Sequence, residues 1–155
     1  MTAIAVLFTA QFFAQTHEII KHNGEKLAVN FIKIENNLVY YAHPNSMEEQ
    51  KISRYAVAQL NGKSKNNSKV ISEKINFSEK PDYNKVIILK DFETVGLKKA
   101  ENLISYLGVV KGETRWSISE IGENRLKQNA ASKGRQFIVI ISNKMDNLKA
   151  VAYTY

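Results

Sequence analysis

Residues 116–142 read WSISEIGENRLKQNAASKGRQFIVIIS, and the first part of this stretch predicts the start of a helix. Ser117 and Glu120 have the S-x-x-E spacing of a capping box, in which each side chain bonds the other residue's free backbone N–H. Trp116 and Ile121 have the spacing of a hydrophobic staple across the same helix start. Both signals place the first turn of the helix directly after Ser117.

The rest of the stretch predicts how the helix packs and where it ends. Residues at intervals of four form one apolar stripe, and two of its members are small, so we expect the helix to lie close against a sheet: Ile118, Gly122, Leu126 and Ala130. Gly134 lies at the position where a residue in the left-handed backbone conformation commonly ends a helix. We therefore expect one main helix at about residues 117–133 and, at 137–141, a strand covered on both faces.

The first half of the chain has the sequence pattern of strands joined by tight turns. Asn23-Gly24 is the strongest short hairpin signal, and Asn36-Asn37 separates two further apolar runs. The apolar alternation changes parity at Phe31-Ile32, which predicts a β-bulge or a strong bend there. Residues 51–60 are interpreted as one strand. We expect an antiparallel meander of about four strands in residues 16–62, a β-rich subdomain.

The second half predicts a different arrangement. Residues 63–84 are expected to form an exposed linker and an irregular segment, because the run 63–69 contains no apolar residue. Residues 85–155 are expected to form an α+β subdomain, in which strands at 85–89 and 104–110 precede the helix. The predicted fold class is α+β: an N-terminal antiparallel β meander, then a β-β-α-β-β sheet with one main helix packed on it.

The chain begins with an apolar run. Residues 2–14 are uncharged, and the run is shorter than the roughly 20 residues that span a bilayer. Its length matches the apolar region of a signal peptide, so residues 1–15 are interpreted as a signal peptide. No basic residue precedes the run, as in a signal peptide with a truncated start. The alternative is a buried N-terminal strand or helix. The mature chain is then expected to be periplasmic or extracellular, with no integral membrane segment.

Two segments resemble known exported proteins. The run NRLKQNAASKGRQFIVIIS, residues 124–142, resembles the helix–glycine–strand motif of the YbjQ-like and RcsF-like α/β modules of bacterial envelopes. The opening HEIIKHNGEKL, residues 17–27, and the preceding Phe13-Ala14-Gln15 resemble uncharacterised exported envelope proteins of Bacteroidetes. RcsF-like proteins depend on cysteines, and this chain has none. The resemblance implies export and an α/β module, and it transfers no functional residue.

Charge and motifs exclude several function classes. The net charge is +7, but residues 16–60 carry as many acidic as basic side chains, and no nucleic-acid-binding motif occurs. We therefore expect no nucleic-acid partner. The three histidines lack acidic partners at ligand spacing, so no metal site and no cofactor are predicted. No nucleophile–base motif occurs, so no catalytic residue is assigned and the protein is not expected to be an enzyme.

A binding surface is the remaining prediction. Tyrosines and lysines supply the candidate ligand-binding residues, although tyrosine on a strand more often serves packing: Tyr40, Tyr41, Lys63, Lys65 and Lys69. The leading interpretation is a non-enzymatic exported envelope protein that binds another protein or a glycan through its β-rich half, with an exposed sheet edge as one means. The alternatives are a binder of a small ligand or anionic envelope polymer, and a hydrolase with an unrecognised site.

Overall fold

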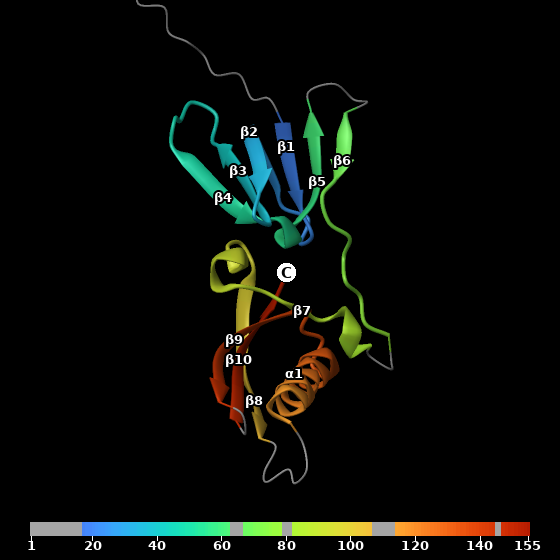
Figure 1. Cartoon of the computed structure of the whole chain (residues 1–155). Coiled ribbons are helices and arrows are strands. Elements are labelled where there is room, and N and C mark those ends of the chain that lie inside the picture. Colours follow the sequence, from blue (N-terminus) through green and yellow to red (C-terminus); the bar gives the residue numbers. More distant parts are fainter. Residues whose placement is uncertain (1–16, 63–66, 79–81, 107–113, 145–146) are drawn as a thin grey trace, which may run out of the picture.

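The computed structural model describes residues 17–62, 67–78, 82–106, 114–144 and 147–155. It contains a six-stranded antiparallel sheet, a sheet of four strands and one main helix that lies against the second sheet (Figure 1). The protein is therefore α+β, as predicted, and most of its regular structure is sheet.

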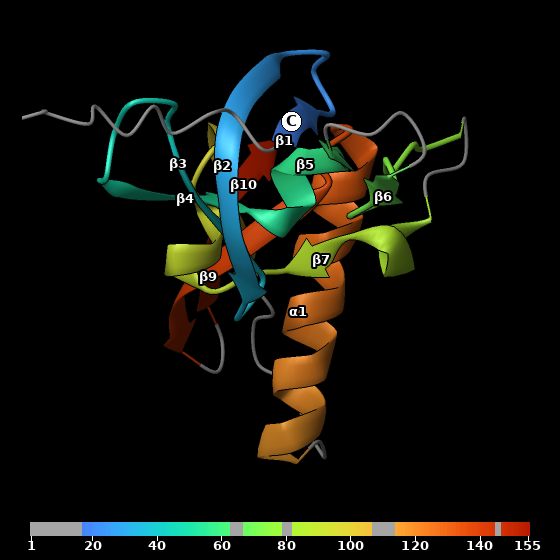
Figure 2. The same cartoon turned by 90° about the horizontal axis from the view of Figure 1, so that it is seen from above.

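The first sheet holds the expected meander and extends it. Its strands follow the order β4-β3-β2-β1-β5-β6, and the view from above shows β2 bending strongly along its length (Figure 2). The strands are β1 His17–Lys21, β2 Lys26–Glu35, β3 Leu38–Ala42, β4 Glu49–Ser53, β5 Val57–Gly62 and β6 Ser68–Val70. Among the described residues, β4 and β6 each pair on one side only, so they form the two opposite edges of the sheet.

Local turn chemistry shapes this sheet where the sequence predicted it. Gly24 closes the β1–β2 hairpin at φ +88°, and Asn36-Asn37 close the β2–β3 hairpin at φ 51° and 60°. Glycine and asparagine are the residues that adopt this left-handed conformation at least cost. The register shift between Phe31 and Lys33 is the predicted bulge. Both hairpins and the bulge are confirmed.

The predicted single strand at 51–60 is wrong. The chain leaves β4 at Ser53, whose side-chain oxygen accepts a hydrogen bond from the Tyr55 N–H, and one 3-10 turn follows, η1 Arg54–Ala56. β5 then pairs with β1 rather than continuing β4. A serine hydroxyl bonds nearby backbone and so competes with strand pairing, which explains the break. This break separates β4 from β5 and leaves β4 at one edge of the sheet.

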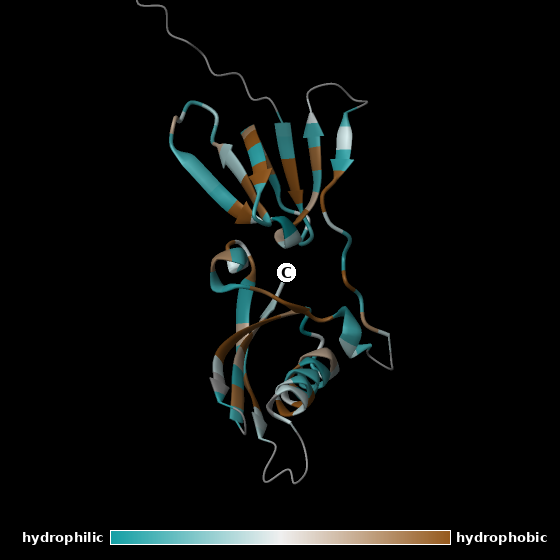
Figure 3. Cartoon of the chain, in the orientation of Figure 1, coloured by the Kyte–Doolittle hydropathy of each residue, from teal (hydrophilic) through white to brown (hydrophobic). Residues whose placement is uncertain are grey.

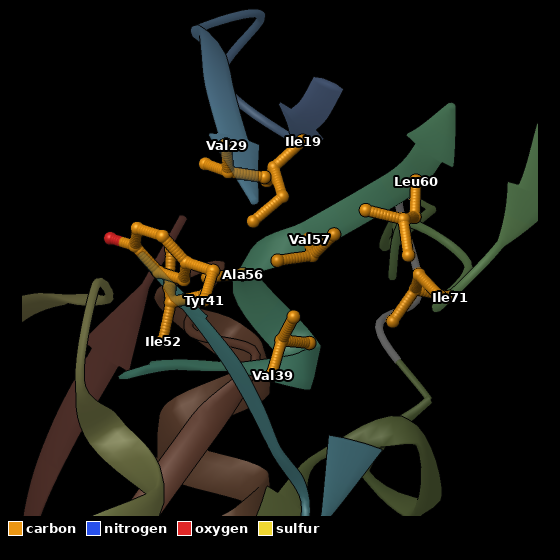
Figure 4. Packing of buried hydrophobic residues seen from close by; sticks show 9 residues of the cluster. All are labelled: Ile19, Val29, Val39, Tyr41, Ile52, Ala56, Val57, Leu60 and Ile71. Atoms are coloured by element: carbon orange, nitrogen blue, oxygen red, sulfur yellow. The ribbon is translucent and has the colours of Figure 1, made fainter. Parts of the chain in front are cut away.

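Nine buried side chains form the core of the first sheet (Figure 4). They come from β1 to β5, from η1 and from the segment after β6: Ile19, Val29, Val39, Tyr41, Ile52, Ala56, Val57, Leu60 and Ile71. Ile19, Val29, Val39 and Val57 are completely inaccessible to solvent. Each large apolar side chain buried in this way contributes about 1.5–3 kcal/mol of stability.

The second sheet has the strand order β7-β9-β10-β8, with β7 parallel to β9. Its elements are η2 Tyr83–Lys85, β7 Ile87–Ile88, η3 Asp91–Thr94, β8 Lys98–Tyr106, α1 Arg115–Ser132, β9 Phe137–Lys144 and β10 Asn147–Thr154. The predicted β-β-α-β-β order is confirmed. Only two residues of the expected strand at 85–89 pair as a strand. Of the strand expected at 104–110, residues 107–110 lie outside the described residues.

Helix α1 begins earlier than predicted. Thr114 is the N-cap and forms a capping box with Ser117, so the predicted box of Ser117 with Glu120 is wrong. Trp116 lies inside the first turn with 76% of its surface exposed, which also rules out the predicted staple. Threonine, like serine, can be the first residue of a capping box, and Thr114 precedes Ser117 by the three residues that the box requires. Gly134, at φ +68°, ends the helix as predicted.

The apolar stripe of α1 packs closely on the second sheet. A Cβ added at Gly122 would lie 2.9 Å from Leu148 Cδ1, so a glycine is needed for this approach. Leu126 and Ala130 are fully buried in the same core. Figure 3 shows that the opposite side of the helix is mostly hydrophilic. The predicted close packing is confirmed.

Strand β9 is buried on both faces over only part of its length. Phe137, Ile138 and Val139 are buried, but Ile141 is 59% exposed. The reason is that β7 pairs only with Phe137 and Ile138, and that the β9–β10 register shifts beside Ile141. The prediction of a strand covered on both faces is therefore wrong for its last residue.

The two sheets contact each other through a small apolar cluster. The ring of Phe137, which is fully buried, lies 5.8 Å from the ring of Tyr55 in η1 and 5.3 Å from that of Tyr155. The Ser53 N–H, at the end of β4, donates a 2.8 Å hydrogen bond to the Val95 carbonyl that follows η3. Both side-chain and backbone contacts therefore connect the first sheet to the second half of the chain.

Candidate interaction site at the β4 edge

A hollow of about 420 Å³ lies beside the free edge of the first sheet. Its lining comes from β3, from β4 and the residue before it, and from the loop after η3: Tyr40, Glu48, Glu49, Gln50, Lys51 and Val95. One of these, Tyr40, was a candidate ligand-binding residue from the sequence. The Tyr40 side chain therefore lies in the same hollow as residues of the edge strand β4.

The backbone of β4 has unpaired hydrogen-bonding groups on its outer side. Because Ser53 donates to Val95, its N–H points away from β3. Backbone groups alternate in direction along a strand, so those of Lys51 and Glu49 point outward as well. No hydrogen bond from these outward groups to another described residue is present. An open edge of this kind is a template for a further strand.

The β2–β3 hairpin independently indicates that the backbone groups of Lys51 point away from β3. A two-residue turn makes Glu35 and Leu38 a hydrogen-bonded pair, so the Leu38 backbone groups point toward β2. Leu38 is opposite Ser53, and Tyr40 is opposite Lys51. By the same alternation, Lys51 has no ladder bond to Tyr40 and faces outward.

The outer face of the sheet at this edge carries mixed charges. Tyr40 lies between its cross-strand neighbours Lys33 and Lys51. Lys33 Nζ is 5.1 Å from the Tyr40 ring centroid and 2.7 Å from Glu35 Oε2. The hydrogen bond with Glu35 raises the pKa of the Lys33 ammonium, and the charges of Glu35 and Glu49 raise it further. Two of the residues that line the hollow are glutamates, so its chemistry does not match a polyanion.

The other sequence candidates lie elsewhere. Tyr41 points into the core and is 8% exposed, with its pKa raised by that burial. Lys69 is exposed in β6, at the opposite edge of the sheet from β4. Lys63 and Lys65 lie outside the described residues. The structure therefore does not bring the tyrosines together with Lys69, and of the candidates among the described residues only Tyr40 lines the hollow. The sequence signal near the β4 edge is the chain break that Pro44-Asn45-Ser46 predicts before the charged residues of β4.

A histidine–serine pair, which the sequence pattern did not predict, has the distance of a nucleophile–base pair. His22 Nε2 lies 2.8 Å from Ser72 Oγ, 50 residues away along the chain. Ser72 donates its hydroxyl proton to the Val57 carbonyl, which can only accept. His22 must therefore donate to Ser72, and the hydroxyl is not activated as a nucleophile. The pair links the β1–β2 turn, β5 and the segment after β6.

The three histidines lie in different places, each against an aromatic ring. His17 lies 5.3 Å from Phe31, and His43 lies 5.6 Å from Tyr41. In the part of the chain that the structure describes, no three His, Asp or Glu side chains gather where they could hold a metal ion.

Comparisons with known proteins identify no relative. No family model, curated protein or solved structure matches the chain. Within the described ranges, no helix has the length and apolar character needed to cross a membrane.

Proposed function

We propose that this protein is a non-enzymatic, exported envelope protein whose β-rich half binds another protein at the open edge of β4. The observation that supports this proposal most directly is the pair of outward-facing residues Glu49 and Lys51 beside a hollow. Main-chain hydrogen bonds supply affinity in strand addition, and neighbouring pockets supply specificity. Export is supported by the apolar run at residues 2–14.

The alternative, a binder of an anionic envelope polymer, has less support at this site. Glu48 and Glu49 line the hollow together with a single lysine, Lys51. A polyanion in the hollow would lie against both carboxylates. Of the lysines that led to this alternative, Lys69 lies in β6 and not at the β4 edge, and Lys63 and Lys65 lie outside the described residues.

Site-specific crosslinking in the native host tests the proposal. A photoreactive amino acid replaces Gln50 in β4, and the control places it at Lys69, on the opposite edge. We expect a discrete crosslinked protein adduct from position 50 and none from position 69. Equal adducts from both positions, or none from either, would contradict binding at β4.

Export has its own test. Cells that produce the full chain are fractionated, and the mature N-terminus is read by mass spectrometry. We expect the protein in the periplasm or the medium, with an N-terminus near residue 16. Recovery of the chain with Met1 in the cytoplasm would contradict export.

A further inference from the structure

We infer that the open edge of β4 pairs with the β4 edge of a second copy of this chain, antiparallel and with a two-fold axis at Gln50. This inference rests on the proposed function, since it names the protein that the edge binds. It follows from the order of charges along the strand, Glu49-Gln50-Lys51.

The charges select one register among the symmetric ones. In a two-fold antiparallel pair, one residue meets its own copy on the axis. An axis at Lys51 or at Glu49 would put two like charges directly opposite each other, which is destabilising. An axis at Gln50 instead puts Glu49 opposite Lys51 of the second copy, and Lys51 opposite Glu49 of the second copy. Both cross-strand pairs then have opposite charges.

The backbone favours the same register. Glu49 and Lys51 are the residues of β4 whose N–H and C=O groups point outward and lack partners among the described residues. With the axis at Gln50, they become directly opposed partners. Each such pair exchanges two N–H···O bonds, which closes the free edge in both copies.

Val95 sets the length of this pairing. The next outward group along β4 is the Ser53 N–H, which the Val95 carbonyl already occupies at 2.8 Å. In the Gln50 register, Ser53 would otherwise be opposite Met47 of the second copy. The added ladder therefore ends before Ser53 and covers Glu49, Gln50 and Lys51 of each copy.

The pairing also covers the β4 part of the hollow. Glu49, Gln50 and Lys51 line it and are the residues that the second strand would contact. The contact is short, so the dimer belongs to the small, transient class of interfaces. We expect a reversible dimer whose population rises with protein concentration.

Sedimentation equilibrium of four purified proteins tests the inference: the wild type, Glu49→Lys, Lys51→Glu and the double variant. Each single variant places like charges opposite each other in both pairs, so we expect its dimer dissociation constant to rise about tenfold or more. The double variant restores opposite charges and should dimerise as the wild type does. An equimolar mixture of the two single variants should form heterodimers, because one copy then carries only lysines and the other only glutamates at these positions.

Matched controls make the same charge changes away from β4. Lys69→Glu lies on the β6 edge and Glu73→Lys in the following segment, and both side chains are exposed. We expect both controls to dimerise like the wild type. Circular dichroism of every variant checks that the fold is kept.

The possible outcomes separate this inference from the proposed function. A wild type that stays monomeric at high concentration, while position 50 crosslinks to a different protein in cells, overturns the self-pairing and leaves the proposed function standing. A dimer that tolerates both single variants places the contact elsewhere and also overturns the inference. A monomer with no crosslink from position 50 contradicts both.

Discussion

The ring of His22 lies 4.5 Å from the ring of Tyr155, so the first hairpin turn of the chain contacts the end of the last strand. The Tyr155 hydroxyl oxygen also accepts a 2.9 Å hydrogen bond from the Ile75 N–H. The pKa of Tyr155 is raised by burial, although that hydrogen bond lowers it in part. These contacts join the first sheet, the segment after β6 and the second sheet at one point.

His22 makes stability depend on pH. Burial lowers its pKa below 6.5, and the charge of Lys74 lowers it further. The unfolded chain therefore takes up the proton at a higher pH than the folded protein does, and the neutral ring stabilises the fold. We expect the free energy of unfolding to be highest above pH 6.5 and to fall as the pH drops through that value. Urea titrations from pH 5 to 8 measure this, with the slope reduced in His22→Gln.

Tyr155→Phe removes one hydrogen bond and keeps the ring. The Ile75 N–H loses its partner, so we expect a loss of about 1–2 kcal/mol in the free energy of unfolding. Tyr106→Phe is the matched control, because Tyr106 is 68% exposed and should change stability little. Equal effects of the two substitutions in urea denaturation would contradict a role for the Tyr155 hydroxyl.

Gly96→Ala tests the close approach of the two halves. Gly96 has φ +85°, and a Cβ there would lie 2.6 Å from Ile52 Cγ1 in the first core. Gly24→Ala is the control, since Gly24 has φ +88° and open space around it. The backbone strain of about 1–2 kcal/mol is common to both. We expect Gly96→Ala to cost about 1–3 kcal/mol more because of overpacking, as measured by thermal and urea unfolding.

Asn37→Gly isolates a polar link between the halves. Asn37 Nδ2 donates a 2.7 Å hydrogen bond to Oε1 of Glu93, a carboxylate that is only 7% exposed. Glycine keeps the positive φ of the turn but removes the donor, so we expect a loss of about 1–3 kcal/mol. Asn36→Gly, at the neighbouring turn position, should cost less. A double-mutant cycle with Glu93→Ala measures the coupling, and additive effects would argue against the link.

Substitutions at the start of α1 distinguish the two capping boxes. Thr114→Ala removes the N-cap side chain, and we expect a loss of about 1 kcal/mol. Glu120→Ala should leave stability within about 0.5 kcal/mol of the wild type, because it caps nothing in the observed helix. The reverse order of effects in thermal unfolding would place the helix start at Ser117 instead.

Much of the secondary structure was predictable because it depends on local chemistry. Gly24, Asn36, Asn37 and Gly134 adopt the left-handed backbone that each turn or helix end requires. The helix start was misplaced because both Thr114 and Ser117 are competent caps. The strand at 51–60 was misread because its apolar pattern continues through Ser53, where the chain turns.

The candidate site was only partly predictable. Tyr40 was a candidate from its residue type alone, while Glu49 and Gln50 gave no signal of their own. Whether β4 is an edge depends on the pairing of β5 with β1. That pairing joins distant segments, and periodicity within a strand says nothing about which strands become its neighbours.

The sequence by itself therefore determined the elements of this protein: its hairpins, its glycine-terminated helix and the α+β order of its strands. Their determinants lie within a few residues of each other, in backbone preferences and apolar spacing. Only the tertiary structure decided which strand edge stays open, and which distant side chains meet at the boundary between the sheets. Those features depend on the packing of groups such as Asn37 and Glu93, which are 56 residues apart. Local preferences cannot specify contacts over that distance.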